Sequence, residues 1–173
     1  MPYTSDTFTH RGNEFTASLD YDSGIGRPWE EHDGHGPVRA GGRHNYHGYT
    51  SKLPGEMVLY SDRFSSWLYD YREACRIALR DGWGFAGKSR AEWLAQGLTA
   101  RQVAARAAID DFNRLRAWCN NEWHWCGLTV TLDGTEYSAS LWGLESDDYA
   151  GHEEYARELA DECLAQLDHS FAA

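Results

Sequence analysis

The sequence predicts an α+β fold in which a small antiparallel sheet is packed by three main helices. Three observations point to this class. Segments with alternating apolar residues occur near both ends of the chain, three segments show helical periodicity, and the regular strand–helix alternation of a parallel doubly wound sheet is missing. With 173 residues, 42% of them hydrophobic, and eight Trp, the chain has the size and the apolar content of a single domain spanning residues 1–173.

The N-terminal part predicts two strands separated by a long loop. Residues 1–12 show no apolar period and are expected to form a loose arm. A half-buried strand follows, in which alternate residues are apolar, namely Phe15, Ala17, Leu19 and Tyr21. Residues 22–55 form a Gly- and His-rich stretch without a sustained period, and irregular segments of this length are more often functional than idle. A short second strand is predicted at residues 56–60.

Two amphipathic helices are predicted next. In residues 61–82, apolar side chains recur at steps of three and four, and Gly82 supplies the C-terminal stop. The second helix opens with a T-x-x-Q capping box formed by Thr99 and Gln102, and it is expected to end near Trp123.

The last third predicts a hairpin and a helix. Asp133–Gly134 favours a two-residue turn that pairs Leu132 with Thr135, so that one face of the hairpin is apolar and the other carries Thr and Ser. A final helix opens at Asp147 or Asp148. Its apolar stripe consists of residues four apart, namely Tyr155, Leu159, Cys163 and Leu167.

Negative charge is concentrated in this last third. The chain has 16 Lys and Arg against 27 Asp and Glu, a net charge of −11, and residues 117–173 hold 12 acidic residues but a single basic one. Direct nucleic-acid binding is disfavoured because it draws on clustered basic residues. No apolar run is long enough to span a membrane, and the first 30 residues lack the order of a signal peptide, so a soluble cytosolic protein is expected.

The C-terminal helix carries a row of carboxylates opposite its apolar stripe, including Glu154, Glu158, Asp161 and Glu162. Such a row is most often the solvated face of a helix. The sharper hypothesis is that the carboxylates imitate a phosphate array and bind a basic nucleic-acid channel on another protein. Trp29 is a candidate anchor for a partner, since Trp residues contribute strongly to interfaces.

The Gly- and His-rich stretch contains a candidate metal site. The potential ligands lie within six residues, namely Glu30, Glu31, His32, Asp33 and His35. Zinc bound by His32, Asp33 and His35, with Glu31 or Asp33 as general base, would give a metal-dependent hydrolase. The ordinary interpretation is a structured loop whose charged groups cap turns, with no cofactor and no catalytic residue. His44 and His47 repeat the H-x-x-H spacing and extend the potential ligand set.

Five runs of the chain share a pattern: FTASLDYD at 15–22, PWEEHDGHG at 28–36, PGEMVL at 54–59, RDGWG at 80–84 and LRAWCNNEW at 115–123. In these runs the chain resembles a group of uncharacterised small proteins encoded by tailed bacteriophages and prophages. The resemblance implies a phage setting and the host bacterial cytoplasm, and it implies no particular reaction. Because His44 and His47 fall outside the shared pattern, it also weakens a four-histidine metal site.

The leading hypothesis is a non-enzymatic phage accessory protein that binds a host protein with a basic surface, as an anti-defence or host-takeover inhibitor. The competing hypothesis is the metal-dependent hydrolase. A third is a structural or nucleic-acid-accessory role, in which Lys and Arg of residues 63–116 form a basic face. The sequence makes no prediction of oligomeric state.

Overall fold

The computed structural model describes residues 4–41, 52–83, 92 and 95–171. The chain forms two compact units: unit 1 consists of residues 1–25 and 123–173, and unit 2 of residues 26–122. Unit 2 is therefore inserted into unit 1, between its N-terminal strands and its C-terminal hairpin. The sequence predicts one domain, because neither unit is marked by a change in apolar content.

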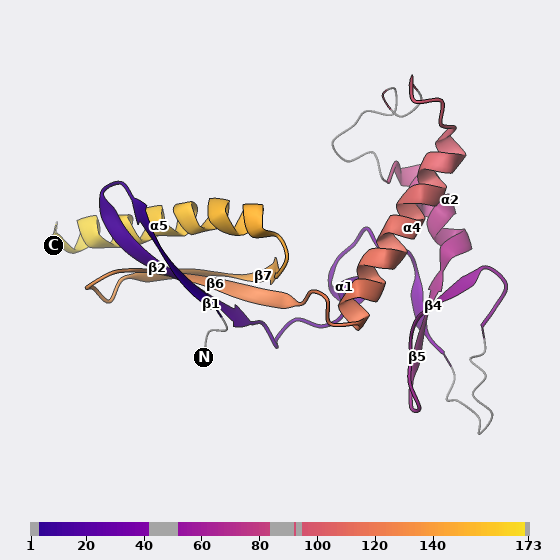
Figure 1. Ribbon diagram of the computed structural model, residues 1–173, viewed down its shortest axis with the longest axis horizontal. Coiled ribbons are helices and arrows are strands. Elements are labelled where there is room, and N and C mark those ends of the chain that lie inside the picture. Colours follow the sequence, from indigo (N-terminus) through magenta and orange to yellow (C-terminus); the bar gives the residue numbers. More distant parts are fainter. Residues whose placement is uncertain (1–3, 42–51, 84–91, 93–94, 172–173) are drawn as a thin grey trace. The chain divides into compact units, whose positions relative to one another are not determined.

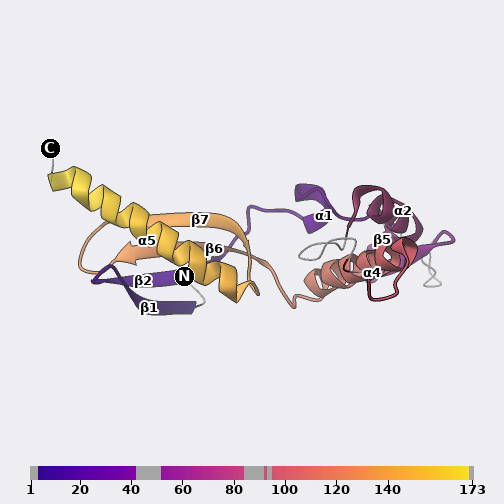
Figure 2. The same cartoon turned by 90° about the horizontal axis from the view of Figure 1, so that it is seen from above.

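Unit 1 is a four-stranded antiparallel sheet covered on one face by a helix (Figure 1). The order across the sheet is β1-β2-β6-β7, and the helix α5 packs against β6 and β7 (Figure 2). The elements are β1 (Thr4–His10), β2 (Asn13–Tyr21), β6 (Trp125–Leu132), β7 (Ser138–Glu145) and α5 (Tyr149–Phe171).

The expected N-terminal arm is wrong for residues 4–10, which form the edge strand β1 and pair with β2. The turn between the strands uses Arg11 and Gly12, both at positive φ (49° and 82°). Such a two-residue turn matches the right-handed twist of a hairpin. Phe8 stacks on Phe15 with ring centroids 5.5 Å apart, on the inner face of the sheet. Thr and Ser occupy most of the other positions, and they conceal the strand period in the sequence.

The C-terminal hairpin forms with a longer loop than the sequence predicts. Leu128 pairs with Leu141 and Val130 with Ala139, a register shifted by two residues from the expected one. Between Leu128 and the turn, a shift of two keeps each side chain on its face, since strand side chains alternate with a period of two. An irregularity between Cys126 and Leu128 changes the register further, so that Cys126 pairs with Leu144. The core of unit 1 contains Phe15, Leu128, Val130, Leu132, Ala156, Leu159, Ala160 and Cys163. Of the predicted helix stripe, Leu159 and Cys163 are buried and Tyr155 and Leu167 are partly buried, and Ala156 and Ala160 join them.

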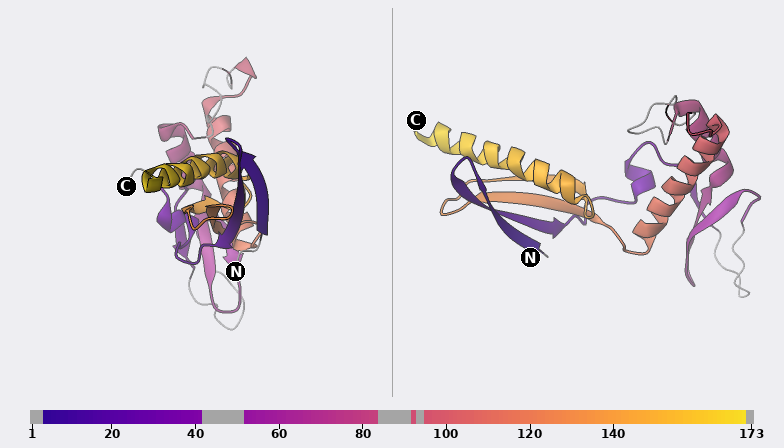
Figure 3. Two further views of the ribbon diagram at one scale, coloured as in Figure 1. Left: turned by 90° about the vertical axis from the view of Figure 1, so that its left-hand side faces the viewer. Right: turned by 45° about the horizontal axis from the view of Figure 1, so that its top comes forward.

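The described residues of unit 2 form a three-stranded antiparallel sheet, in the order β3-β5-β4, and the helices α1, α2 and α4 (Figure 3). The strands are β3 (Val38–Ala40), β4 (Glu56–Ser61) and β5 (Ser66–Asp70), and the helices are α1 (Pro28–Glu31), α2 (Tyr71–Asp81) and α4 (Ala100–Cys119). The core gathers residues from β4, β5, α2 and α4, namely Leu59, Tyr69, Ala74, Ala108, Phe112 and Leu115. The stretch expected to be an irregular loop, residues 22–55, thus contains α1 and β3.

The predicted helix over residues 61–82 is wrong in nearly its first half, residues 61–70. The carboxylate of Asp62 accepts hydrogen bonds from the backbone N–H groups of Phe64 and Ser65, both at 2.7 Å, and this turn leads into β5. The helix begins at α2, where the side chain of Asp70 caps the N–H of Glu73 at 2.9 Å. The apolar spacing of this segment suits a strand as well as a helix, and β5 is buried on the sheet.

Several local predictions are confirmed. Gly82 ends α2 in the left-handed conformation (φ 75°), and Thr99 and Gln102 form both bonds of the capping box of α4. α5 follows Asp148, whose carboxylate accepts a hydrogen bond from the N–H of Gly151 at 3.1 Å. The α+β class is confirmed, with the strand at residues 56–61 in a second sheet. Among the described residues, no helix is long and apolar enough to cross a membrane.

Candidate functional site

Charge divides along the boundary between the two units. Unit 1 holds 15 acidic and 2 basic residues, a net charge of −13, whereas unit 2 holds 12 acidic and 14 basic residues, a net charge of +2. Unit 1 contains both the acidic residues of the N-terminal strands and those of the C-terminal helix. The unit therefore produces a negative potential that attracts cationic groups.

The solvent-facing side of α5 carries the densest row of carboxylates. Glu154, Glu158 and Glu162 are exposed and lie four residues apart, so they are stacked along one line of the helix. Carboxylates at this spacing repel one another, and a cation bound across them relieves that repulsion. The basic residue on this helix, Arg157, lies 3.7 Å from Glu153 and is also exposed.

Asp161, which the sequence groups with this row, has a different role. Its two carboxylate oxygens bind His10 Nε2 at 2.6 Å and Arg11 Nη2 at 2.9 Å. These contacts fasten the β1–β2 turn to α5. The exposed row without such contacts to β1 is therefore Glu154, Glu158 and Glu162, whereas Asp161 is used within unit 1.

Trp29 lies in unit 2 and packs into its aromatic core. Its ring centroid is 5.6 Å from those of Trp67 and Trp118, and the guanidinium of Arg27 lies 4.1 Å from the centre of the Trp67 ring. The indole Nε1 is buried without a hydrogen-bond partner among the described residues. The structure thus places Trp29 and the α5 carboxylates on different units.

The candidate metal ligands of residues 30–35 do not converge. Glu30 binds Arg27 at 2.8 Å, and Glu31 Oε1 accepts a hydrogen bond from the N–H of Gly26 at 3.2 Å. His32 and Asp33 are exposed. Within the described part of the chain, no group of three or more His, Cys, Asp or Glu residues is placed to hold a metal ion. His44 and His47 lie outside the described residues.

His35 instead belongs to a polar cluster with Asp111, a residue of α4 that the sequence analysis does not identify. Asp111 Oδ1 lies 2.6 Å from His35 Nδ1, and its Oδ2 accepts hydrogen bonds from the Tyr69 hydroxyl at 2.7 Å and the Gly36 N–H at 2.8 Å. Burial, together with the charge of Asp111, raises the pKa of Tyr69 above its usual range.

An aspartate bound to the Nδ1 of a histidine orients the imidazole, as in general-base pairs. Here the same contacts also attach residues 35 and 36 to α4 and β5. The sequence signal for Asp111 is a carboxylate directly before the buried Phe112, on a helix with an otherwise apolar inner face. That signal is weak, because it does not indicate which distant residue the carboxylate meets.

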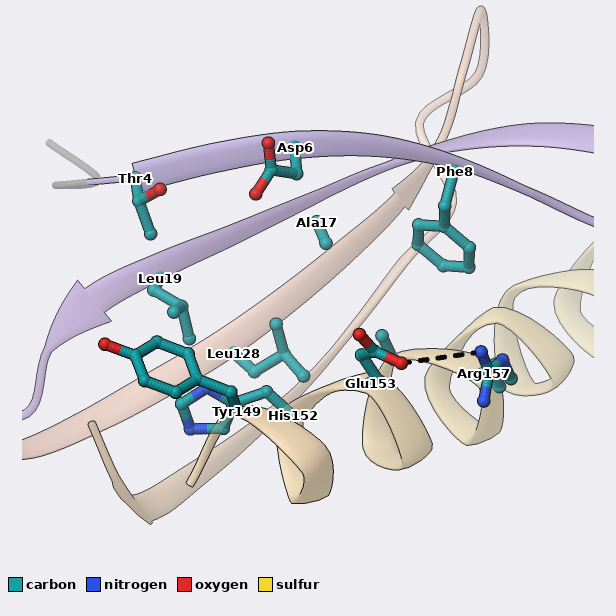
Figure 4. Close-up of a pocket in the computed structure, with 11 residues that line it drawn as sticks. Thr4, Asp6, Phe8, Ala17, Leu19, Leu128, Tyr149, His152, Glu153 and Arg157 are labelled. Carbon is teal, nitrogen blue, oxygen red and sulfur yellow. Dashed lines mark ion pairs between the residues drawn. The ribbon is translucent and has the colours of Figure 1, made fainter. Parts of the chain in front are cut away.

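Unit 1 also contains a pocket of about 500 Å³ on the inner face of its sheet (Figure 4). It exists because α5 packs over β6 and β7 and leaves the inner side of β1 and β2 partly uncovered. The lining comes from β1, β2, β6 and the first turns of α5, namely Thr4, Asp6, Phe8, Ala17, Leu19, Leu128, Tyr149, His152, Glu153, Ala156 and Arg157. The sequence analysis does not identify this pocket, because β1 is missing from the predicted sheet.

His152 is the buried polar residue of that lining. Its Nε2 lies 3.8 Å from the Sγ of Cys126, which is fully buried in β6. A thiol with no access to solvent has no access to a substrate, so the contact packs the start of α5 onto the sheet. All four cysteines are free.

No protein-family model matches the chain, and neither a curated protein nor a solved structure matches it. The roles of the α5 carboxylates, the His35–Asp111 pair and the pocket therefore follow from their own geometry and chemistry.

Proposed function

We propose that the protein is a non-enzymatic phage accessory protein that binds a basic surface of a host protein through unit 1. The observation that carries the proposal is the segregation of charge, with −13 in unit 1 against +2 in unit 2. A single folded unit with this charge repels nucleic acids and acidic proteins, and it accelerates encounters with basic ones.

The face of α5 is the proposed contact surface. Successive carboxylates of Glu154, Glu158 and Glu162 rise by about 6 Å along the helix axis, at 1.5 Å per residue. A protein groove that holds nucleic acid presents Lys and Arg side chains to a comparable row of negative charges. Occupation of such a groove on a host defence or regulatory protein would block its nucleic acid, which is the proposed inhibitory action.

The proposal is tested by affinity capture from bacterial lysate, with mass spectrometry as the readout, at low and moderate salt. The test variant carries Glu154→Lys, Glu158→Lys and Glu162→Lys. The control variant carries Asp33→Lys, Asp110→Lys and Glu122→Lys, three exposed acidic residues of unit 2. Both variants change the net charge by the same amount, and only the location differs.

We expect a host protein that the wild type and the control variant retain in stoichiometric amounts and that the α5 variant loses. A short DNA duplex should displace that protein from unit 1, because both ligands occupy the same groove. If every captured protein is retained equally by the α5 variant, the α5 face is not the contact surface. If DNA and unit 1 bind the captured protein together, the mimicry of nucleic acid is wrong.

A further inference from the structure

The pocket between β1 and α5 lies apart from the row of carboxylates proposed to contact a host protein. Its lining residues do not include Glu154, Glu158 or Glu162. We propose that this pocket binds a small organic cation with an apolar body, such as an aromatic or alkyl amine. This second site does not depend on the proposed function.

The size and the floor of the pocket favour an apolar body. A volume of about 500 Å³ falls within the usual range of about 300–1,000 Å³ for small-molecule sites. The floor is apolar, and it consists of side chains from three strands and from α5, namely Phe8, Ala17, Leu19, Leu128 and Ala156. An apolar ligand group placed on this floor would remove the exposed carbon surface from water.

The rim supplies negative charge from both sides. Figure 4 shows Asp6 on β1, opposite Tyr149 and Glu153 on α5. Asp6 forms no ion pair with any described residue, and Glu153 is held only by the exposed 3.7 Å contact with Arg157. A cationic group at the rim would meet the Asp6 carboxylate and the ring of Tyr149, which is 75% exposed.

The charge of the surroundings excludes an anionic ligand. Arg157 is the cationic residue of the lining, and it already faces Glu153. The remaining lining carboxylate, together with a net charge of −13 for unit 1, opposes the entry of an anion. Apolar walls strengthen this selection, because they focus the field within the pocket.

The test is isothermal titration calorimetry of the full chain with two matched probes, 2-phenylethylammonium and the neutral 2-phenylethanol. The two differ only in the group that would lie at the rim. Methyl resonances of Leu19 and Leu128 locate the binding. Asp6→Asn removes the rim charge and keeps its shape, whereas Glu136→Gln removes the same charge at an exposed residue of the β6–β7 loop, outside the pocket lining, and serves as the control.

We expect the ammonium probe to bind at least ten times more tightly than the alcohol. Asp6→Asn should weaken its binding about two- to fivefold, the range for an ion pair of an exposed carboxylate, while Glu136→Gln should change it less than twofold. Equal binding of both probes, or no effect of Asp6→Asn, overturns the proposal. No heat and no methyl shift at millimolar ammonium probe overturns it as well. Failure here leaves capture of the host protein unaffected, because that experiment uses other residues.

Discussion

The two units differ in how some of their carboxylates are used. Two carboxylates of unit 2 are used internally: Glu56 is buried against Arg39, with hydrogen bonds of 2.5 and 2.8 Å, and Asp111 receives three polar contacts. The guanidinium of Arg39 lowers the pKa of Glu56 accordingly. In unit 1 most of the helix carboxylates point to solvent. Carboxylates used within a unit stabilise it, and those left outside are available to a partner.

Each unit contains a histidine–aspartate pair, and the two pairs differ in how far the carboxylate is buried. His35 and Asp111 in unit 2 and His10 and Asp161 in unit 1 each lie 2.6 Å apart. The side chain of Asp111 is 10% exposed and that of Asp161 is 41% exposed. The same type of contact therefore has a largely buried carboxylate in unit 2 and an exposed carboxylate in unit 1.

The largest expected effect tests whether the two units are separate cooperative entities. Phe15→Ala empties the core of unit 1 and Leu115→Ala that of unit 2, and both side chains are fully buried. Each change should cost about 3–5 kcal/mol of stability. Because no core cluster among the described residues combines the units, each variant should lower only one of two transitions in differential scanning calorimetry. A single transition lowered equally by both would contradict this.

The intermediate effect compares the two histidine–aspartate pairs. Asp111→Ala leaves the Gly36 N–H without its acceptor and the Tyr69 hydroxyl with only the Ala108 carbonyl, 3.1 Å away, and should cost about 1–3 kcal/mol. Asp161→Ala removes a contact that water replaces and should cost less than about 1 kcal/mol. Urea unfolding measures both, and Asp110→Ala, at the exposed neighbour on α4, is the control. Equal losses for the two pairs would show that their difference in burial has no energetic consequence.

The smallest expected effect concerns Asp62, a half-buried carboxylate in the turn between β4 and β5 of unit 2. The hydrogen bond from the Tyr60 hydroxyl, followed by those from the N–H groups of Phe64 and Ser65, lowers its pKa from 3.8 to about 2. The folded state thus binds this proton less readily than the unfolded state. Its contribution to stability is complete above about pH 4 and is lost as the pH falls towards 2.

Asp62→Asn should accordingly flatten the pH dependence of unit 2 stability between pH 4 and 2, measured by urea unfolding. Tyr60→Phe removes the hydrogen bond that contributes most to the lowered pKa of Asp62. In this variant Asp62 should therefore become protonated in the folded state at a higher pH than in the wild type. An unchanged acid profile in both variants would exclude Asp62 as its origin.

The confirmed predictions rest on interactions between residues that are close together in the sequence. The capping box of Thr99 and Gln102, the stop at Gly82 and the apolar stripe of α5 each act within a few residues of backbone. Residues 66–70 show the limit of such patterns. Their apolar spacing also fits a helix, and only the pairing of β5 with β3 and β4 makes them a strand.

The candidate sites also differ in how much of them the sequence alone reveals. The carboxylate row of Glu154, Glu158 and Glu162 is visible in the sequence, because helical spacing places these residues on one line. In the sequence Asp161 looks equivalent to these residues. Only its contacts with His10, at the end of β1, and with Arg11, in the β1–β2 turn, distinguish it.

By itself the sequence determined the α+β class, the end of α2, the starts of α4 and α5, the faces of the hairpin and the acidic row. Only the tertiary structure decided the division into two units, the partner of Asp111 and the pocket. The physical reason is sequence separation: Phe15 of β2 pairs with Leu132 of β6, and all the residues of unit 2 lie between them in the sequence. Caps and periodicity report on a few neighbouring residues, whereas a pairing over such a distance depends on every segment that competes for the same strand.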